Sequence, residues 1–209
     1  MLLALGLALA VLGHVSQSLT AHALAIVVAT TGVALFLAGP NWVRQAAFPL
    51  GFLLFMLPLP RAFVEVVTLD LQQFVAGFAS AALALGGVSV YQDGLLLHLP
   101  GITLHVDRGC NGVRFLTVLF VVVTAFAHLH LTRGVQRLIV IAVAIPAAIL
   151  ANAFRVTAIV AATQFVGPHA ASGWIHDYIG RSLWVAAIAA MFAFTILLGR
   201  TERQDLRAA

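Results

Sequence analysis

The chain has 209 residues, of which 62% are hydrophobic and only 9% are charged, and its mean hydropathy is +1.07. A soluble globular domain of this length carries far more charged surface, so the composition excludes one and indicates an integral membrane protein. The lipid bilayer is therefore an expected partner. All 11 basic residues are arginines and the net charge is only +4, so nucleic acid is not expected to bind.

The first 60 residues contain two apolar runs and one proline-bracketed run. The apolar runs cover residues 1–13 and roughly 22–38. The first lacks the basic residues that open a signal peptide, so we expect a short or partly interfacial helix that stays with the protein. Residues 48–59 hold Pro49 and Pro58 and fall short of the ~20 residues that a straight span needs, which predicts a broken or tilted helix.

A polar helix and then a change of periodicity follow. The pattern of Arg61–Leu85 is helical, and we expect its polar side chains to face protein or a water-filled cavity: Glu65, Thr68, Asp70, Gln72 and Gln73. Between residues 87 and 107 apolar residues recur at every second position, interrupted by the turn dipeptides Asp93-Gly94 and Pro100-Gly101. These residues predict a small β-meander of two or three strands on the membrane surface.

Three long apolar segments complete the chain, at about residues 110–131, 135–166 and 174–198. Each reaches the length that a membrane-spanning helix requires. The predicted fold class is therefore an all-α polytopic membrane protein, a single integral membrane domain of residues 1–209. We expect a bundle of six or seven transmembrane helices with a small extracytoplasmic β-meander, and the exact count depends on residues 1–60.

The arginine distribution predicts the orientation in the membrane. Arg133 and Arg137 occupy one loop, and the C-terminal tail holds three more arginines. Basic loops stay in the cytoplasm, so both regions should lie on that side of a cell (inner) membrane. The meander, the residues around 110 and the loop at 167–173 should then lie on the extracytoplasmic face.

Cys110, Arg155 and His176 are the candidate catalytic residues, because this topology brings all three toward one membrane face. Cys110 stands at a predicted helix start, where the helix dipole and nearby Arg114 should lower the thiol pKa and favour the nucleophilic thiolate. Histidine acts as general base and acid near neutral pH, and a guanidinium offers fixed donors to an oxyanion. Together these groups predict acyl transfer through a thioester.

Neighbouring residues support this site, and each residue also has a structural explanation. Asn152 lies on the helix face of Arg155 and would orient it or bind substrate backbone, and Asp177 would help to position the site. A lone cysteine is often a small apolar filler, and Arg155 could instead pair with Asp70 or Asp177. His98 and His105 are conceivable metal ligands without an apparent third, so no metal and no cofactor is predicted.

Three motifs, in this order and at these spacings, resemble those of the exosortase/archaeosortase family of membrane-embedded cysteine transpeptidases. They are Cys110-Asn111-Gly112-Val113-Arg114, Asn152-Ala153-Phe154-Arg155 and Gly173-Trp174-Ile175-His176-Asp177. The resemblance covers roughly residues 45–195 and includes the proline-bracketed run and the polar patch Thr68–Gln72. By this resemblance Cys110, Arg155 and His176 form the active site. Asn111, where the family commonly has Ser or Ala, is counted among the supporting residues.

The resemblance implies an endopeptidase or transpeptidase for secreted proteins with a C-terminal sorting signal, made of a short motif, a membrane helix and a basic cluster. The expected reaction passes through a thioester on Cys110, which water or a cell-surface acceptor resolves. Three other functions remain open. They are a transporter or channel lined by Asn152, Arg155 and His176, a non-catalytic assembly factor, and a different membrane acyltransferase or protease.

Overall fold

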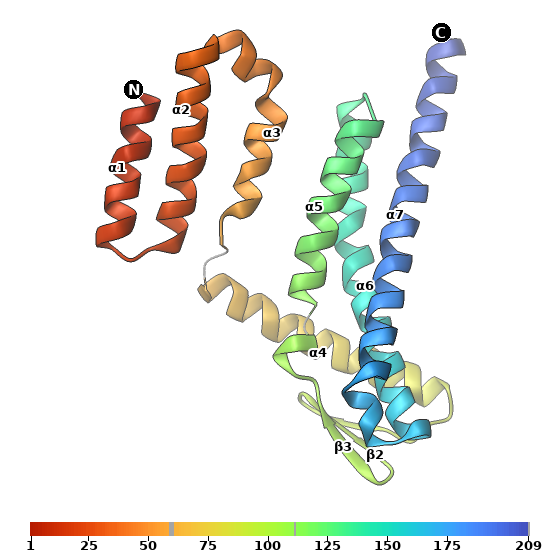
Figure 1. Ribbon diagram of the computed structural model, residues 1–209. Helices are drawn as coiled ribbons and strands as arrows, with labels where there is room; N and C mark the ends of the chain where they lie inside the picture. The colour runs from red at the N-terminus through yellow and green to blue at the C-terminus, as the bar shows by residue number, and fades with distance from the viewer. Residues whose placement is uncertain (59–60, 111, 209) are drawn as a thin grey trace. The chain divides into compact units, whose positions relative to one another are not determined.

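The computed structural model describes residues 1–58, 61–110 and 112–208, and it confirms an all-α polytopic membrane protein with a small sheet (Figure 1). Its described elements are α1 (Leu2–Val15), α2 (Leu19–Gln45), α3 (Ala47–Phe52), η1 (Leu53–Met56), α4 (Arg61–Leu85), β1 (Tyr91–Asp93), β2 (Leu96–Leu99), β3 (Ile102–His105), η2 (Arg108–Cys110), α5 (Val113–His130), α6 (Gly134–Val166), η3 (Pro168–Ala171) and α7 (Trp174–Ala208). Among these residues, five helices are long and apolar enough to cross a bilayer: α2, α4, α5, α6 and α7. The predicted total of six or seven spans requires that one or both of the shorter apolar segments, α1 and α3–η1, also cross.

Residues Met1–Phe63 form one compact unit. Within it α1 packs closely on α2, since a Cβ placed on Gly6 would lie 2.8 Å from the backbone of Ala29. Helix α2 kinks at Gly39, whose φ of +82° is not helical. The next residue, Pro40, has no N–H to donate, so a helical hydrogen bond is missing at the kink. The proline-bracketed run is broken into α3 and η1, as predicted.

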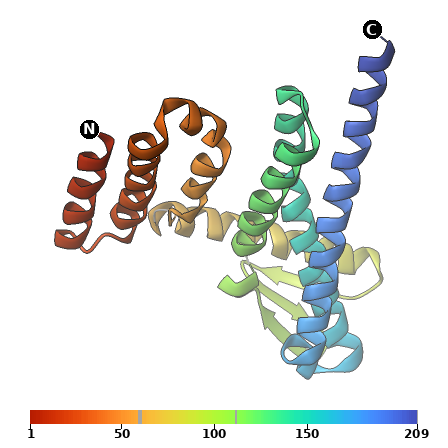
Figure 2. The same ribbon diagram turned by 45° about the horizontal axis from the view of Figure 1, so that its top comes forward.

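Residues Val64–Ala209 form the second unit, and within it α5, α6 and α7 lie side by side (Figures 1 and 2). Their shared core is made of aliphatic side chains at the end of the bundle that carries the α5–α6 turn. Its buried members are Leu119, Val123, Ala127, Leu131, Val140, Ala144, Ala148 and Met191. Phe126 of α5 also stacks on Phe192 of α7 with ring centroids 3.9 Å apart. These contacts hold the three helices together at the end opposite the predicted site.

The sheet and α4 pack at the other end of α6. The strands are antiparallel in the order β1-β2-β3, which confirms the meander, and both turn glycines, Gly94 and Gly101, have positive φ. A second core joins α4, the sheet and the later part of α6, and it consists of Val75, Ala76, Ala79, Leu83, Leu97, Leu99, Val106, Ala153, Val156 and Val160. In both views α4 runs across the direction of α5, α6 and α7 (Figures 1 and 2).

Only part of the predicted polar face of α4 is covered by protein. Thr68 and Gln72 are buried, and the side-chain nitrogen of Gln72 donates to the Val106 carbonyl at 2.8 Å. Glu65 and Asp70 are instead exposed. The buried amide ties α4 to the segment that leads from β3 into η2.

Candidate active site

Side chains of α6 and α7 and the backbone of η2 meet in one hydrogen-bonded cluster. Arg155 donates from Nη2 to Nε2 of His176 at 3.1 Å and from Nη1 to Oδ1 of Asn152 at 3.4 Å. Asn152 is 1% exposed and donates from Nδ2 to the carbonyl of Cys110 at 2.8 Å. The structure therefore brings together three segments that lie far apart in the sequence, with α6 joining the Cys110 turn to the start of α7.

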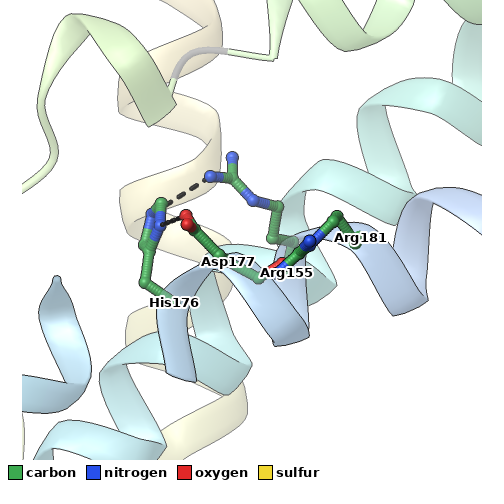
Figure 3. A network of polar contacts seen from close by, with 4 residues as sticks. All are labelled: Arg155, His176, Asp177 and Arg181. Atoms are coloured by element: carbon green, nitrogen blue, oxygen red, sulfur yellow. Dashed lines mark hydrogen bonds and ion pairs between the residues drawn. The ribbon is translucent and has the colours of Figure 1, made fainter. Parts of the chain in front are cut away.

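The contacts of His176 determine the tautomer of its neutral ring. Its Nδ1 lies 3.3 Å from Oδ1 of Asp177, and its Nε2 faces Arg155 (Figure 3). A guanidinium has donors and no acceptor, so Nε2 must accept and the proton of the neutral ring must sit on Nδ1. That proton is donated to the Asp177 carboxylate. Arg155 and Asp177, considered from the sequence as an ion pair, are therefore linked through the His176 imidazole, which contacts both.

Cys110 does not open a helix, which corrects the sequence-based expectation. It ends the 3₁₀ turn η2, where its N–H donates to the Asp107 carbonyl at 2.8 Å. Helix α5 begins at Val113 because Gly112 turns the chain in the left-handed conformation, with φ of +76°. The thiol therefore lies before the first turn of α5 rather than within it.

The predicted direction of the Cys110 pKa is also wrong. Burial raises the pKa of the Cys110 thiol above its ordinary value, and the carboxylate of Asp107 raises it further, while the positive charge of Arg155 opposes both. The net direction is upward, so the thiol is neutral in this arrangement. A neutral thiol becomes a strong nucleophile only when a base removes its proton.

Two cavities adjoin at His176. The larger has a volume of about 510 Å³, and its lining residues are Gly109, Gly112, Arg114, Phe115, Val118, Asn152, Arg155, His176, Asp177, Gly180, Arg181 and Trp184. The smaller has a volume of about 80 Å³ and is lined by Cys110, His105 and His176 together with apolar residues of the sheet, α6 and η3. Cys110 thus belongs to the small cavity, while glycines on either side of it line the large one. His176 is common to both.

Sequence reasoning missed Arg181, Trp184 and Gly180, all of which line the large cavity. Arg181 donates from Nε to the Asp177 carbonyl at 3.1 Å. Arg181 and Trp184 follow Asp177 at the spacing of one helix face, and this spacing is a signal that could have found them. Gly180 shares that spacing but has no side chain to suggest a function. Its role is visible only in space, because a Cβ there would lie 3.1 Å from Nε of Arg155.

The remaining predicted residues have different surroundings. Arg114 is exposed and lines the large cavity, and Asn111 lies outside the described residues. His98 contacts the Thr103 hydroxyl at 3.0 Å, and His105 lies 3.9 Å from the Asp107 carboxylate. Within the part of the chain that the structure describes, no three His, Cys, Asp or Glu side chains are grouped to hold a metal ion.

Comparison with known families places this geometry in context. The model of the transmembrane exosortase family (Exosortase_EpsH) matches residues 1–195, which include all three motifs and every residue of both cavities. No curated protein and no solved structure matches the chain. Since the family model covers most of the sequence, the chain belongs to the transmembrane exosortase family.

Proposed function

We propose that this exosortase is a membrane-embedded cysteine transpeptidase or endopeptidase. Its substrates are secreted proteins, whose C-terminal sorting signal it cleaves at the extracytoplasmic face of the cell inner membrane. The observation that carries the proposal is the double link of Arg155, directly to His176 and through Asn152 to the Cys110 turn. Acyl transfer requires a nucleophile, a base and a fixed cation close together, and Cys110, His176 and Arg155 line two cavities that share His176. Family membership supports the same class of reaction.

The first step joins proton transfer to charge stabilisation. As Cys110 Sγ attacks the scissile carbonyl carbon, its proton passes to Nε2 of His176. That nitrogen is the atom that accepts the hydrogen bond from Arg155 before the reaction. Once protonated, Nε2 can no longer accept, so the guanidinium is released just as negative charge develops on the carbonyl oxygen.

The later steps return the enzyme to its starting state. The C–N bond of the tetrahedral intermediate breaks, His176 gives its proton to the leaving amine, and a thioester remains on Cys110. Water or a cell-surface acceptor then loses a proton to His176 and attacks the thioester carbonyl. The C–S bond breaks, and the Cys110 sulfur takes back the proton.

The two cavities suit two parts of this substrate. The large cavity has polar walls beside His176 and an apolar wall of Phe115, Val118 and Trp184. Its polar part would hold the extended recognition motif, and its apolar part would receive the start of the substrate's membrane helix. The small cavity is mostly apolar and would keep bulk water away from the thioester.

An acyl-enzyme on Cys110 is the expected intermediate. Reconstituted wild-type protein mixed with a tagged protein that carries a sorting signal should form an adduct that hydroxylamine cleaves and that mass spectrometry maps to Cys110. Cys110→Ala should form no adduct and release no product, while eluting from a sizing column in detergent like the wild type. If the folded Cys110→Ala variant processed the substrate at the wild-type rate, Cys110 would not be the nucleophile and the proposal would be wrong.

Asp177→Asn should lower kcat by at least about tenfold, because an asparagine amide can donate to Nδ1 as well as accept from it and no longer enforces the tautomer. The KM should change little, since the carboxylate acts through His176. Asp93→Asn, on an exposed strand end, is the matched control and should be silent. A kcat unchanged by Asp177→Asn would show that the carboxylate does not position the imidazole.

A further inference from the structure

Helix α4 is long and apolar enough to cross a bilayer, but its direction does not fit the other spans. It runs across α5, α6 and α7 in both views (Figures 1 and 2). Its Phe78 meets Phe154 of α6 edge-on at 5.1 Å, and its core residues pack on Val156 and Val160. These positions flank Arg155, so α4 crosses the bundle at the level of the candidate site. If the bundle stands along the membrane normal, α4 lies near the membrane plane.

The side chains of α4 form three stripes at helical spacing. One stripe is buried against α6 and the sheet and contains Thr68, Gln72, Val75, Ala76, Ala79 and Leu83. A second is apolar and faces outward in part, and it contains Val67, Leu71, Phe74, Phe78 and Leu85, with Phe74 46% exposed and Leu85 91% exposed. A third lies on the other flank and is mainly polar; it contains Val66, Asp70, Gln73, Gly77 and Ser80, of which Val66 is 64% exposed. Apolar and polar flanks on either side of a protein-facing stripe suit a boundary between lipid and water.

The apolar stripe continues the lipid-facing surface of the bundle. Phe154, its partner on α6, is 54% exposed and comes before Val156 and Val160, nearer to the middle of the long helix. The apolar stripe therefore lies toward the membrane-embedded part of α6. A spanning α4 would instead carry exposed Asp70 and Gln73 in its first half, where acyl chains offer no hydrogen bonds.

We propose that α4 does not span the membrane but lies flat in the interface of the leaflet beside the candidate site. Its apolar stripe rests on acyl chains and its polar stripe faces water. The Gln72 side chain ties this helix to the Val106 carbonyl, a few residues before Cys110. The depth of α4 in the leaflet therefore sets the height of the Cys110 turn above the bilayer. This inference concerns the membrane surface and does not depend on the reaction.

Cysteine accessibility tests the proposal sharply, because Cys110 is the only cysteine and Cys110→Ser yields a cysteine-free background. Single cysteines replace Glu65 and Ala84 near the two ends of α4, and Gln73 and Phe74 on its polar and apolar stripes. Ser172→Cys and Thr132→Cys report the two sides of the bundle. A membrane-impermeant maleimide is applied to intact spheroplasts and to inverted vesicles, and each variant is first checked on a sizing column in detergent. Ser80→Cys replaces Gln73→Cys if that variant does not fold.

Glu65→Cys, Gln73→Cys and Ala84→Cys should all react from the side on which Ser172→Cys reacts, and Thr132→Cys from the other side. Phe74→Cys, next to Gln73→Cys in sequence, should react at least about tenfold more slowly until detergent removes the lipid. Reaction of the two ends of α4 from opposite sides would establish a span and overturn the proposal. Equal protection of the two neighbouring stripe positions would overturn it as well. No substrate is needed, so failure here is distinct from failure of the proposed reaction.

Discussion

Arg155→Gln is expected to reduce the rate of substrate processing by about 10²–10³-fold, the usual cost of losing one oxyanion donor. The side chain makes the hydrogen bonds that join Asn152 to His176, and in the proposed reaction it also supplies the charge that faces the developing oxyanion. Loss should appear in kcat more than in KM. Arg137→Gln is a suitable control, because Arg137 donates to the Leu131 carbonyl at the far end of the bundle. A rate within about twofold of the wild type would contradict the role of Arg155.

The reactivity of the Cys110 thiol tests the effect of replacing Arg155 without any substrate. The positive charge of Arg155 lowers the thiol pKa, so its removal should raise that pKa further and shift the alkylation of Cys110 by iodoacetamide to higher pH. Arg155→Lys keeps the charge but loses the planar fork of donors. It should leave the alkylation profile close to that of the wild type while processing still falls. Identical profiles for wild type and Arg155→Gln would place the guanidinium too far from the thiol to act on it.

Gly112→Ala is expected to cause a large loss of both stability and substrate processing, because it breaks the link between α6 and the Cys110 turn. A Cβ at this position would lie 2.7 Å from the Asn152 amide, whose Nδ2 donates to the Cys110 carbonyl. The left-handed backbone at residue 112, with φ of +76°, adds about 1–2 kcal/mol of strain for an L-residue. Thermal unfolding in detergent and substrate processing should both be impaired.

Gly101→Ala separates these two causes. Gly101 has φ of +81°, but a Cβ there would meet nothing within 4 Å. It should therefore lose stability through strain alone and keep its processing activity. In the double variant Gly112→Ala with Asn152→Ala, the clash disappears, so the loss of stability should be smaller than the sum of the two single losses. Additive losses would show that Gly112 does not act through Asn152.

Local patterns in the sequence were sufficient for the elements and for the class of fold. Alternating apolar residues and two glycine turns predicted the meander, and its inward side chains Leu97 and Leu99 are buried. The three long apolar runs predicted α5, α6 and the start of α7 to within a few residues, because the length and hydropathy that a bilayer requires can be read from contiguous residues, whereas α7 continues about ten residues past its predicted end at 198. Counting those spans also predicted that Cys110, Arg155 and His176 lie toward one membrane face.

The tertiary structure decided what depends on contacts between distant residues. Whether the Cys110 pKa rises or falls depends on how deeply η2 is buried and how near Arg155 approaches, and the sequence indicates neither. The need for glycine at 112 and 180 arises from side chains of α6. The direction of α4 arises from packing on α6 and the sheet, since hydropathy records how much apolar surface a helix has and not which way the helix points.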